Sequence, residues 1–486
     1  MRLAGVWIAD PATRFNFLRP VTPESSLLTR PSIGLLMLAI GLTVIMRGVT
    51  MWMLPTSFQA DPDAYRAISV TIAESGVFGL TGAAGDPKPT AFRPPLYPWM
   101  ISFVVFDGNL SRLGLGCFHL VLASLTSCCV FLVTRRLARQ IDHADQDRWN
   151  DNRAWWGDRL GVIAAILVAV DPILLRQSTE VMTETLATTL TTAVIWLWCR
   201  WEADENHQTI NSIVSPAGLG VLLALAYLCR PTFLVWAILL IAATVFKNRN
   251  RRGIVSAFVM GAIVTIAVIG WTTRNDRRFG HPIWATTHGG YTLLLANNDS
   301  FYRYLTDDSS RRTSFWQAWN ADEFLNAYQH RYEGDPRSAT FWKQEWTGQP
   351  SYAGATSEYD DDRLCYEAAV ATIKRQPAVF VWSAVVRVAR LWSPFPHDVS
   401  DRSKLITVAV ACFYIAIYAA ASTTMIRQRR IVFGSRWWAI WLLAFTLSGV
   451  HAVYWSNLRM RAPVVPAIAV VAVFCFKAGH RRARNR

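Results

Sequence analysis

The chain has 486 residues and a net charge of +15, from 49 Lys and Arg against 34 Asp and Glu. Hydrophobic residues make up 52% and charged residues only 17%, whereas soluble domains carry about 25% charged residues. This composition argues against a large soluble enzyme, and also against a disordered chain, which needs low hydrophobicity. The 22 tryptophans favour a membrane protein, because tryptophan is enriched at membrane–water interfaces.

Long apolar runs are the main pattern of the sequence. A run of about 17–25 apolar residues crosses a bilayer as a helix, because every backbone polar group must be satisfied within the segment. About ten such spans are predicted, at 32–54, 113–134, 159–175, 181–199, 215–229, 231–246, 253–272, 404–425, 435–454 and 460–477. Arg230-Pro231 divides what is otherwise one long run. The predicted fold class is an all-α polytopic membrane protein with outer amphipathic helices and a small outer domain.

Basic residues gather after the second, sixth, eighth and tenth spans, at 135–139, 247–252, 427–430 and 477–486. These clusters share one side if the spans alternate in direction, and the positive-inside rule assigns that side to the cytoplasm. We therefore expect both termini in the cytoplasm. The positive charge is then topological, and we expect no nucleic-acid partner.

This topology divides the chain into segments with different surroundings. They are a cytoplasmic segment 1–31, a membrane core 32–272 with a first outer loop 56–112, an outer domain 273–403, C-terminal spans 404–477 and a basic cytoplasmic tail 478–486. No Walker motif, nucleotide-binding GxGxxG unit, CxxC or HExxH is present. We expect chemistry at the outer face, with no metal site; no required cofactor is the best expectation, and a divalent cation is possible.

The first outer loop carries two carboxylates. Asp61 followed by Pro62 predicts a helix N-cap with proline in the first helical position. Asp61 either only caps this helix or is a catalytic carboxylate held at the membrane surface. Asp63 either shares that role or only complements the helix dipole.

Arg93 lies between prolines, in the sequence Pro89-Thr-Ala-Phe-Arg-Pro-Pro-Leu-Tyr-Pro98. Proline holds such a stretch extended, so Arg93 is presented close to the outer bilayer surface. A guanidinium fork suits a phosphate. The alternative is an arginine that only reaches toward lipid headgroups.

Other charges stand at the outer ends of spans, against the positive-inside trend. They are Arg176, Arg230, Arg459 and Arg461. Either a phosphate at the outer interface retains them, or they snorkel or form ion pairs. Glu184, just inside the fourth span, costs roughly 2.5–3.5 kcal/mol to insert and is a functional candidate; alternatively it pairs structurally with one of these arginines.

The outer segment is rich in aromatic residues. Tyr302, Tyr304, Trp316, Trp319, Tyr328, Tyr332, Trp342, Trp346 and Tyr352 form either an acceptor groove for sugars or an interfacial belt or small-domain core. From about 361 to 392 the pattern predicts two surface helices, with the second starting at Pro377.

Together, the loop pattern of Asp61, Tyr65 and residues 90–98 resembles the bacterial GT-C glycosyltransferases, in the branch related to protein O-mannosyltransferases and lipid A aminoarabinose transferases. Further similar stretches follow in the same order, at 178–186, 274–298 and 457–466. The resemblance implies an inverting glycosyltransferase in the cytoplasmic membrane whose site faces the periplasm or exterior. It also implies a polyprenyl-phosphate-linked sugar as donor and a hydroxyl of a lipid, glycan or protein as acceptor.

The resemblance also assigns roles to residues. Asp61 occupies the catalytic position, as general base. Relatives often have a second acid directly after it, but here Pro62 intervenes and Asp63 comes next. Arg93 stands where the aminoarabinose branch has lysine. With Arg93, the cations expected to bind the donor phosphate are Arg459 and Arg461, and the supporting residues are Tyr65, Glu184, Arg176 and Arg274.

Two other classes of function remain at this point. A flippase or other transporter of lipid-linked sugars needs charges along a path through the bilayer midplane. Here the charges gather at the outer ends of the spans, except Arg47 in the first. A non-catalytic membrane assembly protein would tolerate a conservative change at Asp61.

Overall fold

The structure is a computed structural model that describes residues 32–54, 56–82, 84–143, 152–203, 211–307, 319–351, 357–396 and 404–476. The expected N-terminal segment 1–31 and the basic tail 478–486 lie outside the described residues.

The described elements follow one another in chain order as α1 (Ile33–Met53), α2 (Tyr65–Ser75), β1 (Gly79–Thr81), β2 (Pro87–Pro89), α3 (Leu96–Ser102), β3 (Val105–Phe106), β4 (Asn109–Leu110), α4 (Arg112–His143), α5 (Asn152–Ala169), α6 (Pro172–Gln177), α7 (Glu184–Ala203), α8 (Asn211–Cys229), α9 (Phe233–Lys247), α10 (Arg251–Phe279), α11 (Gly289–Ala296), α12 (Asp299–Thr306), α14 (Asp322–Gln329), η2 (Phe341–Lys343), α15 (Glu358–Arg375), α16 (Pro377–Trp392), α17 (Lys404–Arg427), α18 (Arg429–Val432), η3 (Ser435–Trp437), α19 (Trp438–Val453), η4 (Leu458–Val464) and α20 (Val465–Val473).

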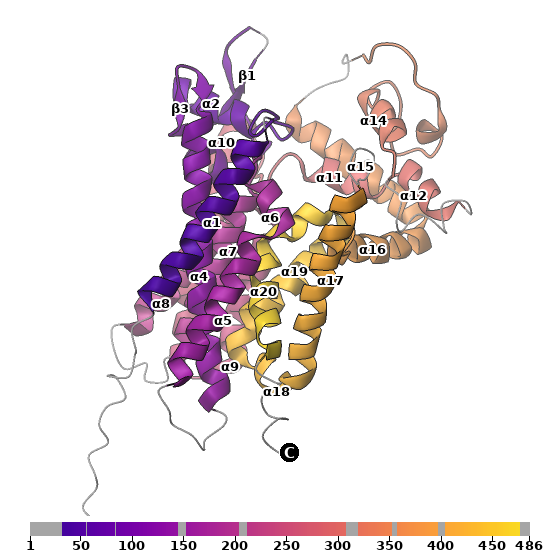
Figure 1. Ribbon diagram of the computed structural model, residues 1–486. Helices are drawn as coiled ribbons and strands as arrows, with labels where there is room; N and C mark the ends of the chain where they lie inside the picture. Colours follow the sequence, from indigo (N-terminus) through magenta and orange to yellow (C-terminus); the bar gives the residue numbers. More distant parts are fainter. Residues whose placement is uncertain are drawn as a thin grey trace, which may run out of the picture.

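The long helices form one bundle, and the strands with α2, α11, α12 and α14 gather at one end of it, whereas the short α18 lies at the other end (Figure 1). A single large hydrophobic core joins α1, α4, α5 and α7 to α17, α19 and α20. Two short strand pairs lie at the end of the bundle that carries α2. β1 pairs antiparallel with β2, with Gly79 opposite Pro89, and β3 pairs with β4. The all-α polytopic fold class predicted from the sequence is confirmed.

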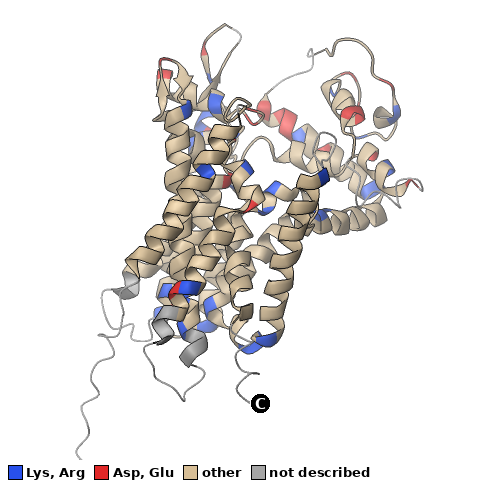
Figure 2. Ribbon diagram, in the orientation of Figure 1, with Lys and Arg blue, Asp and Glu red and all other residues tan. Residues whose placement is uncertain are grey.

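Four of the described helices are long and apolar enough to cross a membrane. They are α1, residues 112–139 of α4, α10 and α17, and two shorter apolar segments are 214–229 and α9. Charged residues gather toward the two ends of the bundle and leave a mostly uncharged belt between them (Figure 2). The chain is therefore a multi-pass membrane protein, and the total of ten spans stays a prediction.

Two of the expected spans have polar interiors. Asp171 ends the predicted span 159–175 early, because it caps α6 by accepting the Leu174 N–H at 2.9 Å, with Pro172 in the first helical position. Arg47, the one charge within the first expected span, donates to the backbone carbonyls of Val168 and Leu174 beside this break. Pro172 has no N–H for the Val168 carbonyl, so the interrupted helix leaves that carbonyl free for the buried Arg47, which shares the Leu174 carbonyl with the Ser178 N–H.

Arg230-Pro231 does separate two helices. α8 ends at Cys229 and α9 begins at Phe233, since Pro231 has no N–H to continue the first helix. The turn between them leaves Arg230 at the same bundle end as the start of α7.

The outer elements have small hydrophobic cores of their own. Phe324 and Trp342 stack with ring centroids 5.7 Å apart, and Trp342 and Tyr302 are buried. Trp342 and Tyr302 therefore belong to the core of a small domain, which was one of the alternatives predicted for the aromatic residues. Trp316 and Tyr352 lie outside the described residues. The two predicted surface helices are α15 and α16, and the second starts at Pro377 as expected.

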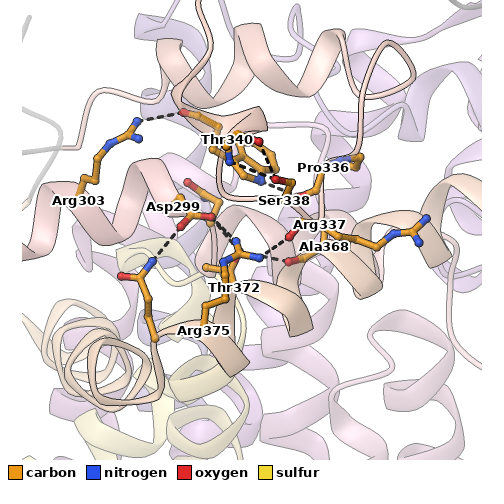
Figure 3. Close-up of polar contacts among 12 residues, drawn as sticks. Asp299, Arg303, Pro336, Arg337, Ser338, Thr340, Ala368, Thr372 and Arg375 are labelled. Atoms are coloured by element: carbon orange, nitrogen blue, oxygen red, sulfur yellow. Dashed lines mark hydrogen bonds and ion pairs between the residues drawn. The ribbon is translucent and has the colours of Figure 1, made fainter.

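Polar contacts join α12 to α15 and to Gln376, the residue between α15 and α16 (Figure 3). The buried Asp299 carboxylate accepts from Arg375 at 2.5 Å and from Gln376 at 2.8 Å. Thr372 donates to the same carboxylate at 3.3 Å. The outer helices therefore hold one another through a charged contact as well as through their apolar cores.

Asp362 of α15 faces the start of α11, where it accepts the backbone N–H of Gly290 at 2.6 Å. Burial raises the pKa of Asp362 to about 7, opposed by the Gly290 hydrogen bond and reinforced by the negative charges of Asp361 and Glu358. A folded-state pKa above the usual 3.8 means that the folded protein binds this proton more tightly than the unfolded chain does.

The stability that this carboxyl contributes is therefore complete below about pH 4 and is lost as the pH rises through about 7. We expect Asp362→Asn to stabilise the protein at pH 8 by about 1–3 kcal/mol and much less at pH 5. Thermal unfolding in detergent at both pH values measures this, with Glu367→Gln on the exposed face of α15 as control. The same effect at pH 5 and pH 8 would contradict the prediction.

Candidate active site

The first outer loop positions its two carboxylates through a turn before α2. α2 begins at Tyr65, so the prediction that Asp61 is the N-cap residue itself is wrong. Residues 61–64 form a turn closed by the Ala64 N–H on the Asp61 carbonyl at 3.2 Å, and Pro62 suits the second position of such a turn. Ala64 leaves the turn with a φ of +57°, a strained value for a residue other than glycine.

The Asp61 side chain still caps α2, from outside the helix. Its two oxygens accept the backbone N–H groups of Arg66 at 3.1 Å and Ala67 at 3.0 Å. These bonds fix the carboxylate, which is partly exposed. Each carboxylate oxygen can accept a second hydrogen bond, so Asp61 remains able to accept a proton.

Asp63 lies between two arginines from distant parts of the chain. Arg93 Nη2 is 2.6 Å from Asp63 Oδ1, and Arg459 Nη2 is 3.6 Å from Asp63 Oδ2. The Asp63 side chain is 19% exposed and that of Arg93 is 10% exposed. This ion pair is therefore mostly buried but still in contact with water.

Arg93 is held on three sides. Its Nε donates to the Asp63 carbonyl at 2.8 Å, beside the ion pair with the same residue. Its guanidinium lies over the rings of Phe92, at 4.4 Å, and Tyr65, at 5.6 Å. Tyr65 in turn packs edge to face on Tyr97. The fork is therefore preorganised by contacts that use its plane as well as its charge.

Glu184 continues the row of charges into the bundle. It is the first residue of α7 and is fully buried. Arg230 Nη2 is 2.7 Å from Glu184 Oε1, and Arg459 Nε is 3.7 Å from the same oxygen. Arg230 also donates to Thr183 Oγ1 at 2.7 Å. Glu184 was predicted to be either a functional residue or the structural partner of an arginine. The structure contains the ion pair with Arg230, and the same carboxylate also holds Arg459.

Arg459 thus joins Glu184 on one side to Asp63 on the other. We call these five side chains the charge row: Arg93, Asp63, Arg459, Glu184 and Arg230. Three arginines face two carboxylates within it, which leaves one positive charge uncompensated. An anion is the ligand that such a row favours.

The remaining predicted site residues lie elsewhere. Arg461 is fully buried, donates to the carbonyls of Leu391 at 3.2 Å and Ser393 at 2.5 Å, and stacks on Tyr414 at 4.0 Å. Arg176 pairs with Glu180, four residues on, at 2.8 Å. The described contacts place neither arginine in the charge row.

Arg274 holds the first outer loop rather than the charge row. Its guanidinium donates to the carbonyls of Thr90 and Phe78, each at 2.7 Å. It therefore acts on the segment that carries Arg93. Among the described residues, no three His, Cys, Asp or Glu side chains are grouped so that they could hold a metal ion.

Sequence reasoning missed two residues beside this site. His288 packs edge to face on Phe92 at 4.7 Å, and its burial, with the positive charge of Arg93, lowers its pKa to about 3. It is therefore neutral near Arg93 at pH 7. Glu358 of α15 accepts hydrogen bonds from Thr90 and Ala91. His288 lies in the stretch 274–298 that resembles the family, where no role was assigned to it, and Glu358 belongs to no motif; only the long-range fold brings either residue to the loop.

Comparison with known proteins gives a family match for part of the chain. Residues 100–253 match a family model described as the protein O-mannosyl-transferase TMEM260 N-terminal domain. No curated protein sequence matches the chain.

Solved structures match over nearly the whole chain. The archaeal oligosaccharyltransferase AglB from Archaeoglobus fulgidus, in complex with an inhibitory peptide and a dolichol-phosphate, aligns with a TM-score of 0.50 and 15% identity over 93% of this chain and 51% of that chain. The chain has the GT-C fold. The fold implied by the resemblance to GT-C glycosyltransferases is confirmed.

A second GT-C structure is more distant. ArnT from Cupriavidus metallidurans bound to undecaprenyl phosphate aligns with a TM-score of 0.36 and 13% identity, over 93% of this chain and 79% of that chain. The 486-residue chain spans about half the length of the archaeal oligosaccharyltransferase that it matches.

Proposed function

We propose that this GT-C protein is an inverting glycosyltransferase that moves a sugar from a polyprenyl-phosphate donor to an acceptor hydroxyl. The observation that carries the proposal is the convergence of Arg93 and Arg459 on Asp63, two residues from the anchored carboxylate of Asp61. Transfer from such a donor releases a lipid phosphate on one side of the reacting carbon and requires a base on the other.

The arginines act on the leaving group. The departing phosphate develops negative charge at the bond that breaks, and positioned cations stabilise that charge in the transition state. Arg93 and Arg459 are already fixed by Asp63 and Glu184, so they need little reorganisation when the donor binds. Asp63 serves in this scheme to orient the two arginines.

Asp61 acts on the acceptor. Its carboxylate takes the proton of the acceptor hydroxyl as the oxygen attacks the sugar, and the sugar–phosphate bond breaks in the same displacement, which inverts the anomeric centre. General-base catalysis of this kind contributes about 10²–10⁴-fold. The two N–H bonds from α2 hold the base in place without occupying all of its acceptor positions.

We place the enzyme in the cytoplasmic membrane, with both termini in the cytoplasm and the charge row facing the periplasm. The basic clusters after α9 and α17, at 247–252 and 427–430, support this orientation. The ligands named for the two GT-C structures, dolichol-phosphate and undecaprenyl phosphate, support a polyprenyl-phosphate donor.

A transfer assay tests the function. Purified protein in detergent is given a radiolabelled polyprenyl-phosphate sugar and an acceptor extract, and label moved from lipid to product is scored. We expect Arg93→Ala to lower kcat by about 10²–10³-fold, the usual loss of one transition-state donor. Arg363→Ala, on the exposed face of α15, is the matched control and should transfer normally. Label that is bound by the wild type and never transferred would refute the transferase.

A further inference from the structure

The segment that carries Arg93 is fastened to three separate parts of the fold. We call residues 89–95 the strap. Its three prolines, Pro89, Pro94 and Pro95, have no backbone N–H to bond. The polar backbone groups between them must therefore find partners outside the strap, because Thr90 and Ala91 are buried.

One peptide group of the strap is braced from both ends by opposite charges. Arg274 Nη1 donates to the Thr90 carbonyl at 2.7 Å, and Glu358 Oε1 accepts the Ala91 N–H at 2.6 Å. The carbonyl and the N–H belong to the same peptide bond. Its dipole therefore lies between a cation of α10 and an anion of α15, and this orientation is fixed by charge-assisted hydrogen bonds.

The second oxygen of Glu358 fixes the adjacent side chain. Glu358 Oε2 accepts from Thr90 Oγ1 at 2.7 Å, and the same hydroxyl oxygen accepts the Phe92 N–H at 3.0 Å. Both carboxylate oxygens are thus directed at the strap, one residue before the ring that supports Arg93. The Ala91 carbonyl accepts from Thr287 N at 3.0 Å, which completes the polar partners of this residue.

Glu358 is well anchored for this task. It stands in the first turn of α15, which Ser357 caps by accepting the Asp360 N–H at 3.1 Å. The ring of the next residue, Tyr359, stacks on His281 at 3.8 Å. The carboxylate is therefore presented from a rigid helix end of the outer domain, 268 residues away from Thr90 in sequence.

We propose that Glu358 is a positioning residue that sets the place of Arg93 through the strap, and so couples the outer domain to binding of the donor phosphate. The inference rests on the proposed function, because it acts through the arginine that binds that phosphate. Loss of the carboxylate leaves the Thr90–Ala91 peptide held by Arg274 alone, and the Arg93 guanidinium then shifts from its place over Phe92 and beside Asp63. Displacement of a binding group by about 1 Å can cost about 100-fold in rate.

Three variants test the coupling. Glu358→Ala removes both acceptors. Glu358→Gln keeps an oxygen for the Ala91 N–H, and its amide can donate to the Thr90 hydroxyl. Thr90→Val removes the second contact, together with the hydroxyl that accepts the Phe92 N–H. The control is Glu367→Gln, an exposed carboxylate on the same helix.

Two measurements are made on each variant in detergent: hydrogen–deuterium exchange of the strap, and binding of undecaprenyl phosphate without any transfer. We expect Glu358→Ala to expose the strap amides to exchange and to weaken phosphate binding about 10- to 100-fold. Glu358→Gln should retain most of both, and Thr90→Val should fall between them.

The decisive comparison is made in the Arg93→Ala background. If Glu358 acts through Arg93, adding Glu358→Ala there should weaken binding no further, whereas independent effects would add. A further full loss in that background, or unchanged binding in Glu358→Ala with an exposed strap, would overturn the proposal. If all variants bind the lipid phosphate as expected but the wild type transfers no sugar, only the proposed transferase is refuted. A wild type that does not bind the lipid phosphate would refute both.

Discussion

Asp61→Asn is expected to lower kcat by about 10²–10⁴-fold, because the amide cannot accept the proton of the acceptor hydroxyl. Folding should change little, since the asparagine oxygen can still accept one of the two N–H groups at the start of α2. Loss of the other bond costs about 0.5–2 kcal/mol, as for other helix caps. Transfer of label and thermal unfolding, measured on one preparation, separate the two effects.

Asp63→Asn is the matched control, because it makes the same chemical change two residues away. Its oxygen can still accept from Arg93, so we expect a weaker donor affinity and a much smaller loss of kcat. If Asp63→Asn loses transfer and Asp61→Asn keeps it, the two roles are exchanged and Asp63 is the base.

Glu184→Ala is expected to destabilise the folded protein by about 3–5 kcal/mol, the cost of removing one partner of a buried ion pair. The Arg230 side chain is only 16% exposed, so its charge stays largely shielded from water when the carboxylate is gone. Denaturation in mixed detergent micelles measures the loss.

Glu202→Ala is the matched control at the other end of α7. Glu202 is as buried as Glu184, but its partner Lys247 is 34% exposed and can turn to solvent, so we expect a smaller loss. The double variant Glu184→Gln with Arg230→Gln should lose less than the two single losses added together, because neither charge is left alone. Additive losses, or equal losses for Glu184→Ala and Glu202→Ala, would show that the pairing contributes little.

The sequence predicted the fold class well, but it did not predict which local structure each Asp-Pro dipeptide adopts. Asp171-Pro172 forms a helix N-cap followed by a first-turn proline. Asp61-Pro62 forms a turn, and α2 starts only at Tyr65. Aspartate followed by proline suits both structures, because proline fixes the same φ in a first helical turn and in the second position of a turn. What lies downstream decides between them, here Asp63 drawn toward Arg93.

The predicted cations show a second limit. Arg459 and Arg461 are two residues apart and were expected to act together, but they lie in η4, a 3₁₀-helix. With three residues per turn, side chains two apart point to different faces. Arg459 therefore meets Asp63, and Arg461 meets Tyr414. Their separation depends on this segment being helical rather than extended, because only an extended chain places residues two apart on one face, and the apolar pattern around Pro463 does not specify which it is.

The contacts that complete the site are beyond any local pattern. Arg93 and Arg459 are brought to one carboxylate from opposite parts of the chain, and Glu358 reaches Thr90 across most of its length. Charges placed against the positive-inside trend identified Arg459 and Arg230 as candidates. Nothing in the sequence around Glu358, one of several acids at the start of α15, distinguishes it from its neighbours.

The surplus positive charge of the charge row also bears on how turnover ends. In the proposed reaction the donor is a phosphodiester with one negative charge, whereas the lipid product is a phosphate monoester, which carries about −1.5 to −2 at pH 7. Three arginines facing two carboxylates hold the more highly charged species more firmly. We therefore expect the spent lipid carrier to bind more tightly than the donor, and its departure to limit turnover.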